Sequence, residues 1–267
     1  MFTHNLDPVL FDFGFLVVRW YSLAYIFGIL IGWWLGKKII IKKFQNFNFE
    51  IKEFDNLITY IIISMLLGGR VGYVLFYNFG YYLSNPLEIL KIWEGGMSFH
   101  GALVGIIFGT YLFSKKKNIQ TFFLLDIIAF VSPIGIFFGR IANFINGELV
   151  GKTTNVFWGV IFPNIDNNIR HPSQLYEAFL EGIILFILMN LIFFNKNYKV
   201  GKCSVMFLII YGCFRITLEF FREPDKHIGY LFENISMGIL LSAIMVLIGL
   251  IIYFTRNNKN ESQYDKY

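Results

Sequence analysis

Hydrophobic residues gather in seven long runs, separated by shorter segments that are richer in polar residues. Several runs approach or exceed the roughly 20 residues that an α-helix needs to cross a bilayer. The pattern therefore predicts an all-α integral membrane protein, a bundle of about seven transmembrane helices. The predicted spans are residues 16–36, 58–77, 101–113, 122–138, 175–194, 205–221 and 235–254, of which the third and fourth are short for a full crossing.

The run of helices is interrupted between the second and third spans by "WEGGMSFHGALVG". Its glycines permit backbone that is not helical, so we expect a re-entrant or irregular segment around residues 94–101. Such backbone is tolerated at membrane depth only inside protein or against a wet cavity. No Pro/Gly/Ser linker, internal repeat or soluble-sized segment appears in the sequence. Residues 1–267 are expected to form a single transmembrane domain, with a short polar tail at residues 256–267.

Charge distribution predicts the orientation of the bundle. Only 15% of residues are charged, against about a quarter in soluble proteins. The basic clusters "KKIIIKK", "SKKKN", "NKNYKVGK" and "TRNNK" follow every second span, and cytoplasmic loops are enriched in Lys and Arg. The N-terminus is therefore expected outside and the C-terminus in the cytoplasm, with spans two, four and six ending at the outer face. Loop lysines account for the net charge of +5, so no nucleic-acid partner is expected.

Polar side chains inside the spans are the informative positions, because ionisable groups are costly in a bilayer and usually face a cavity or a partner. On span four, Arg140 and Asn143 are three residues apart and share one helix face. "NGE" follows them near the outer surface. The other such groups are Arg70 in span two, Gln174, Glu177 and Glu181 in span five, Tyr211, Arg215, Glu219 and Arg222 in span six, and Tyr21 with Tyr25 in span one.

Three classes of protein fit this pattern. In a structural protein, Arg–Glu bridges would hold the bundle together and all charges would be paired. In an anion or phospholipid transporter, an arginine-lined cavity would bind its ligand unchanged; inverted repeats would favour this class, and the sequence shows no such symmetry. In an enzyme, the excess of cations near the outer half would bind an anionic substrate, because guanidinium groups suit phosphate. These cations are Arg70, Arg140, Arg215, Arg222 and His100.

Motifs for metals and protein nucleophiles are missing from the sequence. No HExxH pattern or Cys/His cluster occurs, so no metal site is expected. Ser98 has no G-x-S-x-G context, which disfavours a serine hydrolase. Cys203 and Cys213 are ten residues apart on one predicted helix, too far to form a disulfide. We expect both cysteines to be dispensable.

Five segments carry a resemblance to a known family. "GGRVGYVLFYN", "WEGGMSFHGALVG", "GRIANFINGELVG", "RHPSQLYEAFLEG" and "YGCFRITLEFFREPD" are similar, in this order, to the signature segments of the bacterial phosphatidylglycerol–prolipoprotein diacylglyceryl transferase family. The matching region covers most of residues 19–238. Residues 152–170 form a shorter segment than is usual in the family, and we expect a reduced outer arm there.

The resemblance implies an enzyme of bacterial lipoprotein maturation. The family transfers the sn-1,2-diacylglyceryl group of phosphatidylglycerol to the thiol of the lipobox cysteine in a prolipoprotein signal peptide. The products are a thioether and glycerol-1-phosphate. The implied location is the bacterial cytoplasmic (inner) membrane, multi-pass, with the active site toward the outer (periplasmic) face. The expected partners are phosphatidylglycerol, the lipobox peptide and the lipid bilayer, and no cofactor is expected.

The resemblance also assigns site residues. Either His100, which titrates in a suitable range, or an arginine is expected to activate the thiol. Arg140 and Arg215 are expected to hold the phosphate. Asn143 and Glu148 are expected to bind the head-group glycerol or to fix the arginines. The full expected set is His100, Arg140 and Arg215 for catalysis, and Arg140, Asn143, Glu148, Gly151, Tyr25, Arg70, Glu219 and Arg222 for phosphatidylglycerol.

Overall fold

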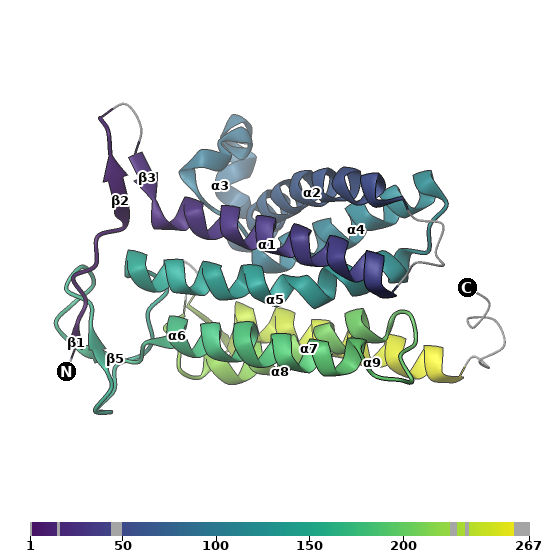
Figure 1. Cartoon of the computed structure of the whole chain (residues 1–267). Coiled ribbons are helices and arrows are strands. Elements are labelled where there is room, and N and C mark those ends of the chain that lie inside the picture. The colour runs from purple at the N-terminus through teal and green to yellow at the C-terminus, as the bar shows by residue number, and fades with distance from the viewer. Residues whose placement is uncertain (1, 15–16, 44–49, 225–228, 233–234, 259–267) are drawn as a thin grey trace. The chain divides into compact units, whose positions relative to one another are not determined.

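The computed structural model describes residues 2–14, 17–43, 50–224, 229–232 and 235–258, which are mainly helical (Figure 1). The chain divides into two compact units. The first comprises Met1–Gly36 and Asp126–Tyr267, and the second comprises Lys37–Leu125. The two units are described separately below, and the predicted single-domain organisation stays a prediction.

The first unit contains most of the long helices. They are α1 (Trp20–Lys43, which runs on into the second unit), α5 (Thr121–Asn146, which begins in the second unit), α6 (Ser173–Glu177), the π-helical turn η3 (Ala178–Ile184), α7 (Leu185–Phe193), α8 (Lys202–Glu219) and α9 (Met237–Asn258). The short strands in this unit are β1 (Phe2–Thr3), β2 (Val9–Asp12), β3 (Val17–Arg19), β4 (Val160–Ile161), β5 (Ile169–Arg170), β6 (Tyr230–Phe232) and β7 (Ile235–Ser236). The second unit contains α2 (Ile51–Tyr77), α3 (Phe79–Ser84), the 3-10 turns η1 (Pro86–Leu90) and η2 (Ile92–Glu94), and α4 (Phe99–Lys117).

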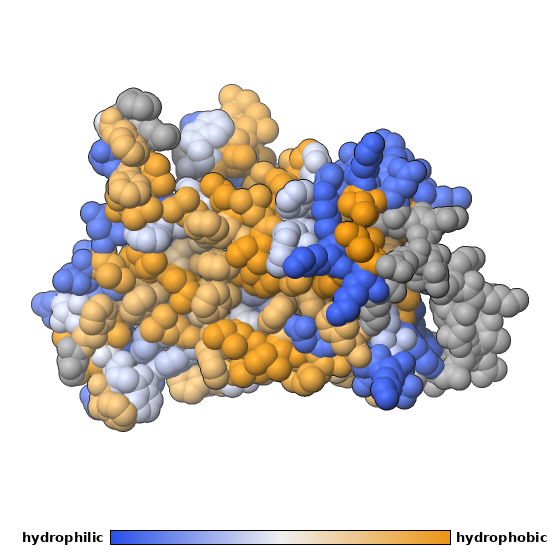
Figure 2. Space-filling model, in the orientation of Figure 1, coloured by the Kyte–Doolittle hydropathy of each residue, from blue (hydrophilic) through white to orange (hydrophobic). Residues whose placement is uncertain are grey.

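A long helix or continuous helical segment occupies each of the seven predicted positions, which confirms the all-α membrane class. Five of them in the described residues are long and apolar enough to cross a membrane: Trp20–Lys42, Ile51–Tyr77, Thr121–Asn146, Ser173–Phe193 and Met237–Arg256. The helices α4 and α8 are less apolar, because α4 ends in three lysines and α8 contains Lys202, Arg215 and Glu219. Hydrophobic side chains cover the visible faces of the helices, while hydrophilic ones gather toward helix ends (Figure 2).

Several helices are longer than the spans predicted from the sequence. The third span, predicted as residues 101–113, is α4, Phe99–Lys117. The fourth, predicted as residues 122–138, is α5, Thr121–Asn146. The apolar run of α5 ends before Arg140, whereas the helix continues because its polar side chains find partners within the protein. The polar tail expected from residue 256 lies outside the described residues from 259 onward.

Irregular backbone does occur before α4, as expected, but it is shorter than predicted. Gly95 and Gly96 have positive φ values of 87° and 75°, a conformation that favours glycine. Ser98 then caps α4 by accepting a hydrogen bond from the Gly101 N–H at 3.2 Å. His100 therefore lies in the first turn of a helix, whereas irregular backbone was expected to carry it.

Glycines allow α2 and α4 to pack backbone to backbone in the second unit (Figure 1). A Cβ added at Gly68 would lie 2.7 Å from the Gly105 Cα, and one added at Gly72 would lie 2.6 Å from the Gly101 Cα. A Cβ at Gly105 would collide with the Ser64 carbonyl oxygen. Small residues four apart are typical of close helix contacts in membranes, because dispersion and weak polar contacts replace the hydrophobic effect there.

In the first unit, glycines serve the same purpose at single points. A Cβ at Gly28 of α1 would lie 2.9 Å from the Gly135 Cα of α5, and one at Gly182 would lie 2.7 Å from the Phe137 Cβ. The second of these contacts brings the π-helical turn against α5. It thereby places the carboxylates of that segment beside the polar end of α5.

A buried carboxylate fixes the opposite end of this unit. Asp126, at the start of α5, is fully buried and accepts hydrogen bonds from the backbone N–H of Gly201 at 2.6 Å and of Ser204 at 2.7 Å. It thus satisfies N–H groups that α8 leaves open at its N-terminus. The Tyr198 hydroxyl donates to the same carboxylate. Burial and this neighbouring carboxylate raise the pKa of Tyr198 far above its usual range, so the phenol keeps its proton.

The basic segments lie at shared ends within each unit, as the alternating clusters predict. In the first unit, Arg256 near the end of α9 donates to the Val200 carbonyl oxygen at 2.8 Å, beside the start of α8. In the second unit, Lys117 at the end of α4 lies 2.6 Å from Glu53, and Lys37 lies 2.8 Å from Asp55, both at the start of α2.

We expect Gly105→Ala to destabilise the α2–α4 pair, because its Cβ would overlap the Ser64 carbonyl oxygen. Overpacking of this kind typically costs about 1–3 kcal/mol, which should appear as a lower melting temperature in detergent. Gly80→Ala in α3 is the matched control, since a Cβ there meets nothing within 4 Å. Equal melting temperatures for the two variants would contradict the backbone contact.

Candidate functional site

Arginine and glutamate side chains form a buried ion network in the first unit. Arg140 donates to Glu181 Oε2 from Nε at 3.2 Å and from Nη2 at 3.0 Å. Arg215 donates from Nη1 to Glu177 Oε1 at 2.9 Å and to Glu181 Oε1 at 3.3 Å, and from Nη2 to Glu219. Both arginines therefore share the same two glutamates, and the network joins α5, the α6–η3 segment and α8.

Local sequence explains why these groups meet. Glu177 ends α6 and Glu181 lies in the π-helical turn, so a widened helical turn carries both carboxylates. Such turns are rare and recur at functional sites. On α8, Arg215 and Glu219 are four residues apart and share one face. Arg222 follows after the helix end and lies 3.8 Å from both Glu177 and Glu219.

The network is balanced in charge but not in exposure. Three guanidinium groups face three carboxylates, which offsets the cost of burying each charge. The Glu177 and Glu181 side chains are 0% exposed, whereas those of Arg140 and Arg222 are 13% and 11% exposed. Arg215 and Glu219 are equally buried, each 6% exposed. Glu177 and Glu181 thus lie behind Arg140 and Arg222, whose guanidinium groups form the accessible side of the network.

Arg140 keeps donors for a further partner. Its Nη1 lies 2.9 Å from Glu177 Oε2, yet that oxygen has no hydrogen-bond partner among the described residues. The contact is therefore an ion pair in which no N–H points at the oxygen. The Nη1 N–H groups make no hydrogen bond to a described residue and remain able to donate.

A second polar group lies one turn further along α5. Asn143 donates from Nδ2 to Glu148 Oε1 at 2.7 Å, and Asn146 donates to the same oxygen at 3.4 Å. The Tyr21 side chain of α1 lies close to Asn143 and Glu148. Its hydroxyl is 3.3 Å from that of Tyr25, one turn along α1. The structure thus brings four predicted residues, Arg140, Asn143, Glu148 and Tyr25, to one end of α1 and α5.

The segment after α5 is held in an unusual backbone conformation. Gly147 and Leu149 both have positive φ, at 64° and 56°, and such a conformation is uncommon for a leucine. Two buried side chains at the start of α6 hold this turn in place: Gln174 donates to the Glu148 carbonyl oxygen at 2.6 Å, and Ser173 donates to the Leu149 carbonyl oxygen at 3.1 Å. The turn therefore presents Glu148 at a fixed position.

Gly151 has a packing role in the structure. Its N–H donates to the His171 carbonyl oxygen at 3.1 Å, and its carbonyl oxygen accepts from Arg170 at 3.0 Å. A Cβ at this position would lie 2.7 Å from the His171 Cβ and 2.8 Å from the Phe221 carbonyl oxygen. Only glycine fits at this position. A contact between Gly151 and phosphatidylglycerol stays a prediction.

The reduced outer arm expected at residues 152–170 contains the hairpin of β4 and β5, and β1 adds to β4 in parallel. Arg170 closes it by pairing with Asp166 and, at 3.2 Å, with Glu223. The guanidinium of Arg170 holds the pKa of Asp166 well below its usual range. Partial burial lowers the pKa of His171, so its imidazole tends to be neutral. The sequence patterns did not single out Arg170, because it lies outside the predicted spans and two of its partners, Gly151 and Glu223, are 19 and 53 positions away.

Arg70 has a saturated set of hydrogen bonds in the second unit. The residue is 5% exposed, and its guanidinium donates to five backbone carbonyl oxygens, which equals its number of N–H groups. The acceptors are Ile89 at 2.9 Å, Gly95 at 2.6 Å, Gly96 at 3.2 Å, Glu88 at 2.6 Å and Lys91 at 3.2 Å. Arg70 thus holds the segment that leads into α4, and we call these five hydrogen bonds the Arg70 clasp.

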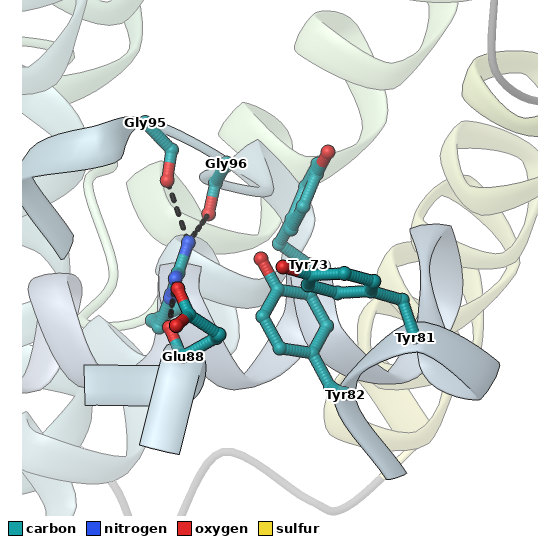
Figure 3. A pocket seen from close by; sticks show the side chains of 7 residues that line it. Tyr73, Tyr81, Tyr82, Glu88, Gly95 and Gly96 are labelled. Carbon is teal, nitrogen blue, oxygen red and sulfur yellow. Dashed lines mark hydrogen bonds between the residues drawn. The ribbon is translucent and has the colours of Figure 1, made fainter. Parts of the chain in front are cut away.

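A small cavity of about 180 Å³ adjoins this clasp, and Tyr73, Tyr81 and Tyr82 border it (Figure 3). The Arg70 guanidinium also lies 5.2 Å from the centre of the Tyr82 ring, in a cation–π contact. His100 belongs to the same unit, where its ring packs edge-on against Phe99. Phosphate binding by Arg70 and proton transfer by His100 stay predictions.

The remaining predicted groups are readily placed. Glu219 is buried and accepts from Ser236 at 2.8 Å, a partner at the start of α9 that the sequence analysis did not identify. Cys203 is buried against the Met189 sulfur, and Cys213 is exposed on α8. Among the described residues, no group of three His, Cys, Asp or Glu side chains could hold a metal ion.

Comparisons with known proteins agree in pointing to one family. The family "Prolipoprotein diacylglyceryl transferase" matches residues 8–255. A protein of Rickettsia bellii (strain OSU 85-389) named "Phosphatidylglycerol--prolipoprotein diacylglyceryl transferase" is 51% identical over 92% of this chain and 94% of its own length. Proteins of the same name from Rickettsia typhi and Ehrlichia canis are each 50% identical over 97% of this chain, covering 100% and 98% of their own lengths. None of these similarities favours the transporter hypothesis.

We expect Arg70→Lys to destabilise the second unit, because a lysine has three donors on one atom and cannot reach five carbonyl oxygens. Hydrogen bonds to a charged group contribute about 1.5–3 kcal/mol each, so the melting temperature should fall by several degrees. Lys91→Ala is the control. It removes an ion pair with Glu88 in the same segment, and exposed pairs contribute about 0–1 kcal/mol. An unchanged melting temperature in Arg70→Lys would show that the clasp is dispensable.

Proposed function

The chain belongs to the prolipoprotein diacylglyceryl transferase family, and on that premise we propose that its Arg140–Arg215 network is where the enzyme holds phosphatidylglycerol for transfer. The reaction moves the diacylglyceryl group to the lipobox cysteine thiol and releases glycerol-1-phosphate. The observation that carries this proposal is the exposure of the network. Arg140 and Arg222 are partly exposed, while Glu177 and Glu181 are fully buried behind them.

The phosphate is the group that this arrangement suits. Displacement at a glycerol carbon leaves a phosphate monoester, so charge accumulates on the phosphate oxygens during the reaction. Donors fixed in advance lower the cost of that charge, because they need no reorganisation when it appears. Arg140 is fixed by two hydrogen bonds to Glu181 and retains its Nη1 donors. Arg215 is fixed by three carboxylates.

The acceptor thiol needs a base, because a cysteine has a pKa near 8.5 and reacts as the thiolate. We propose His100 for this role, since imidazole titrates near neutral pH and the resemblance assigns this position to the active site. His100 lies in the first turn of α4, after the Ser98 cap, so the backbone from which its side chain extends is fixed. The alternative is activation by an arginine. The two differ in how the rate of transfer should depend on pH, because an imidazole titrates near neutral pH and a guanidinium does not.

The lipobox segment of a prolipoprotein signal peptide is the proposed acceptor. The enzyme is proposed to act at the outer face of the bacterial cytoplasmic membrane. Support for this orientation comes from the basic segments, which lie at the ends opposite the polar site within the first unit. The site contains the end of α5 and the end of α8, whereas Arg256 meets Val200 at the start of α8.

The function is tested by mixing the purified protein with phosphatidylglycerol and a synthetic lipobox peptide, then weighing the peptide. A mass gain of one diacylglyceryl group is expected, with release of glycerol-1-phosphate. A peptide whose cysteine is replaced by serine is the control and should keep its mass. An unmodified cysteine peptide, with the protein folded, would contradict the proposal.

The proposed orientation predicts that reporter fusions after Lys43, Lys117, Lys202 and Lys259 all report the cytoplasm. Lys and Arg next to a span favour the cytoplasmic side, and these positions lie in the four basic clusters. Activity of an alkaline phosphatase fusion, which requires export, should therefore be low at all four. High activity at any one of them would contradict the span count.

Arg140→Lys should remain folded yet lose more than about tenfold in kcat/KM, because lysine keeps the charge but not the planar set of donors. Arg140→Ala should lose nearly all activity and bind phosphatidylglycerol more weakly. Arg256→Lys is the control, since Arg256 donates to a loop carbonyl away from the network, and it should keep its activity. Turnover at the wild-type rate in both Arg140 variants would mean that another group holds the phosphate.

A further inference from the structure

Two buried amide oxygens near Glu148 have no hydrogen-bond donor among the described residues: Asn146 Oδ1 and Gln174 Oε1. Gln174 is fully buried. Buried polar atoms are hydrogen-bonded in the great majority of cases, so an exception needs a specific cause. Two such acceptors on residues that both contact Glu148 match a ligand that supplies the donors.

The orientation of the Gln174 amide is fixed by its surroundings. Its Nε2 donates to the Glu148 carbonyl oxygen at 2.6 Å. Exchanging the amide nitrogen and oxygen would set two oxygens against each other at that distance, which is repulsive. The unsatisfied atom of Gln174 is therefore an acceptor, and its ligand must carry a donor.

Both acceptors belong to groups that bind the same residue. Asn146 donates to the Glu148 carboxylate at 3.4 Å, while Gln174 holds the Glu148 backbone. The positive φ values of Gly147 and Leu149 fix the turn between them. Asn143, one turn after Arg140 on α5, donates to the same carboxylate oxygen at 2.7 Å. Glu148 and Asn143 thus connect both acceptors to the part of α5 that carries Arg140.

We propose that Gln174 and Asn146 accept hydrogen bonds from the hydroxyl groups of the head-group glycerol of phosphatidylglycerol. This inference rests on the proposed function. The head-group glycerol is joined directly to the phosphate and carries two O–H donors, so it matches acceptors next to a guanidinium. A head group without hydroxyls would leave both amide oxygens buried and unsatisfied, and sites built for a hydroxyl reject such analogues strongly.

The test compares two lipids as donors of the diacylglyceryl group to a lipobox peptide: phosphatidylglycerol and phosphatidylpropanol, which lacks both head-group hydroxyls. With the wild-type chain, kcat/KM should favour phosphatidylglycerol by about tenfold or more. Gln174→Leu removes the acceptor, so this preference should fall by about threefold or more. Both lipids should react more slowly, because the variant also loses the hydrogen bond to the Glu148 carbonyl oxygen. Phosphatidylglycerol should slow more, because the analogue makes no use of the amide oxygen.

Ser173→Ala is the matched control, because Ser173 is equally buried and also holds the turn, through the Leu149 carbonyl oxygen at 3.1 Å. Its serine has no unsatisfied acceptor, so the variant should slow both lipids equally and keep the preference. Asn146→Ala provides a second reading of the same ratio if Gln174→Leu does not fold.

A preference unchanged from wild type in the folded variants would overturn the inference, and so would a wild-type chain that does not distinguish the two lipids. Failure of the wild-type chain to use either lipid would overturn the proposed function as well. The two failures are distinguishable, because transfer from phosphatidylglycerol is measured in every comparison.

Discussion

Neutralising buried charge is the constraint on which this structure depends. An arginine in an apolar bundle is strongly unfavourable unless an anion lies against it, and the chain meets this requirement with Glu177, Glu181 and Glu219. Because the partners come from different segments, the same contacts fix α5 against the α6–η3 segment and α8. Glu219 extends the network to the start of α9 through Ser236, and Gly238 leaves room for its carboxylate, which lies 2.7 Å from a Cβ built there.

A network in which all charges are paired could be purely structural. The unequal exposure of its carboxylates and guanidinium groups is the feature that suits it to binding a phosphate. If the carboxylates were exposed and the arginines buried, a phosphate would be repelled. The observed order is the reverse, because Glu177 and Glu181 are fully buried while Arg140 and Arg222 are partly exposed. The glutamates therefore hold the arginines in place before a lipid arrives, and part of the ordering cost of binding is met during folding. The same arginine can therefore pair with a glutamate and bind the phosphate.

Residue patterns predicted the helices and the polar faces well, since both depend on local spacing. Gln174, Glu177 and Glu181 were singled out as polar side chains of the fifth span, and all three are buried. The sequence could not reveal which arginine pairs with which glutamate, because Arg140 and Glu181 are 41 positions apart. The π-helical turn has no simple signature in residue periodicity, although it carries Glu181. Arg70 shows the same limit: its five partners are backbone carbonyls, which every residue possesses, so no side-chain pattern distinguishes a clasp from a ligand site.

The most direct measurement is the position of the phosphate in an experimental structure of the chain with phosphatidylglycerol bound. The predicted result is a phosphate oxygen about 2.7–2.9 Å from the Nη1 atom of Arg140, with the contacts from Arg140 to Glu181 still formed. Glu177 and Glu181 would remain buried on the far side of the guanidinium groups. A phosphate bound away from Arg140 and Arg215, or an Arg140 that leaves its glutamates to reach the lipid, would contradict a network organised before the lipid binds.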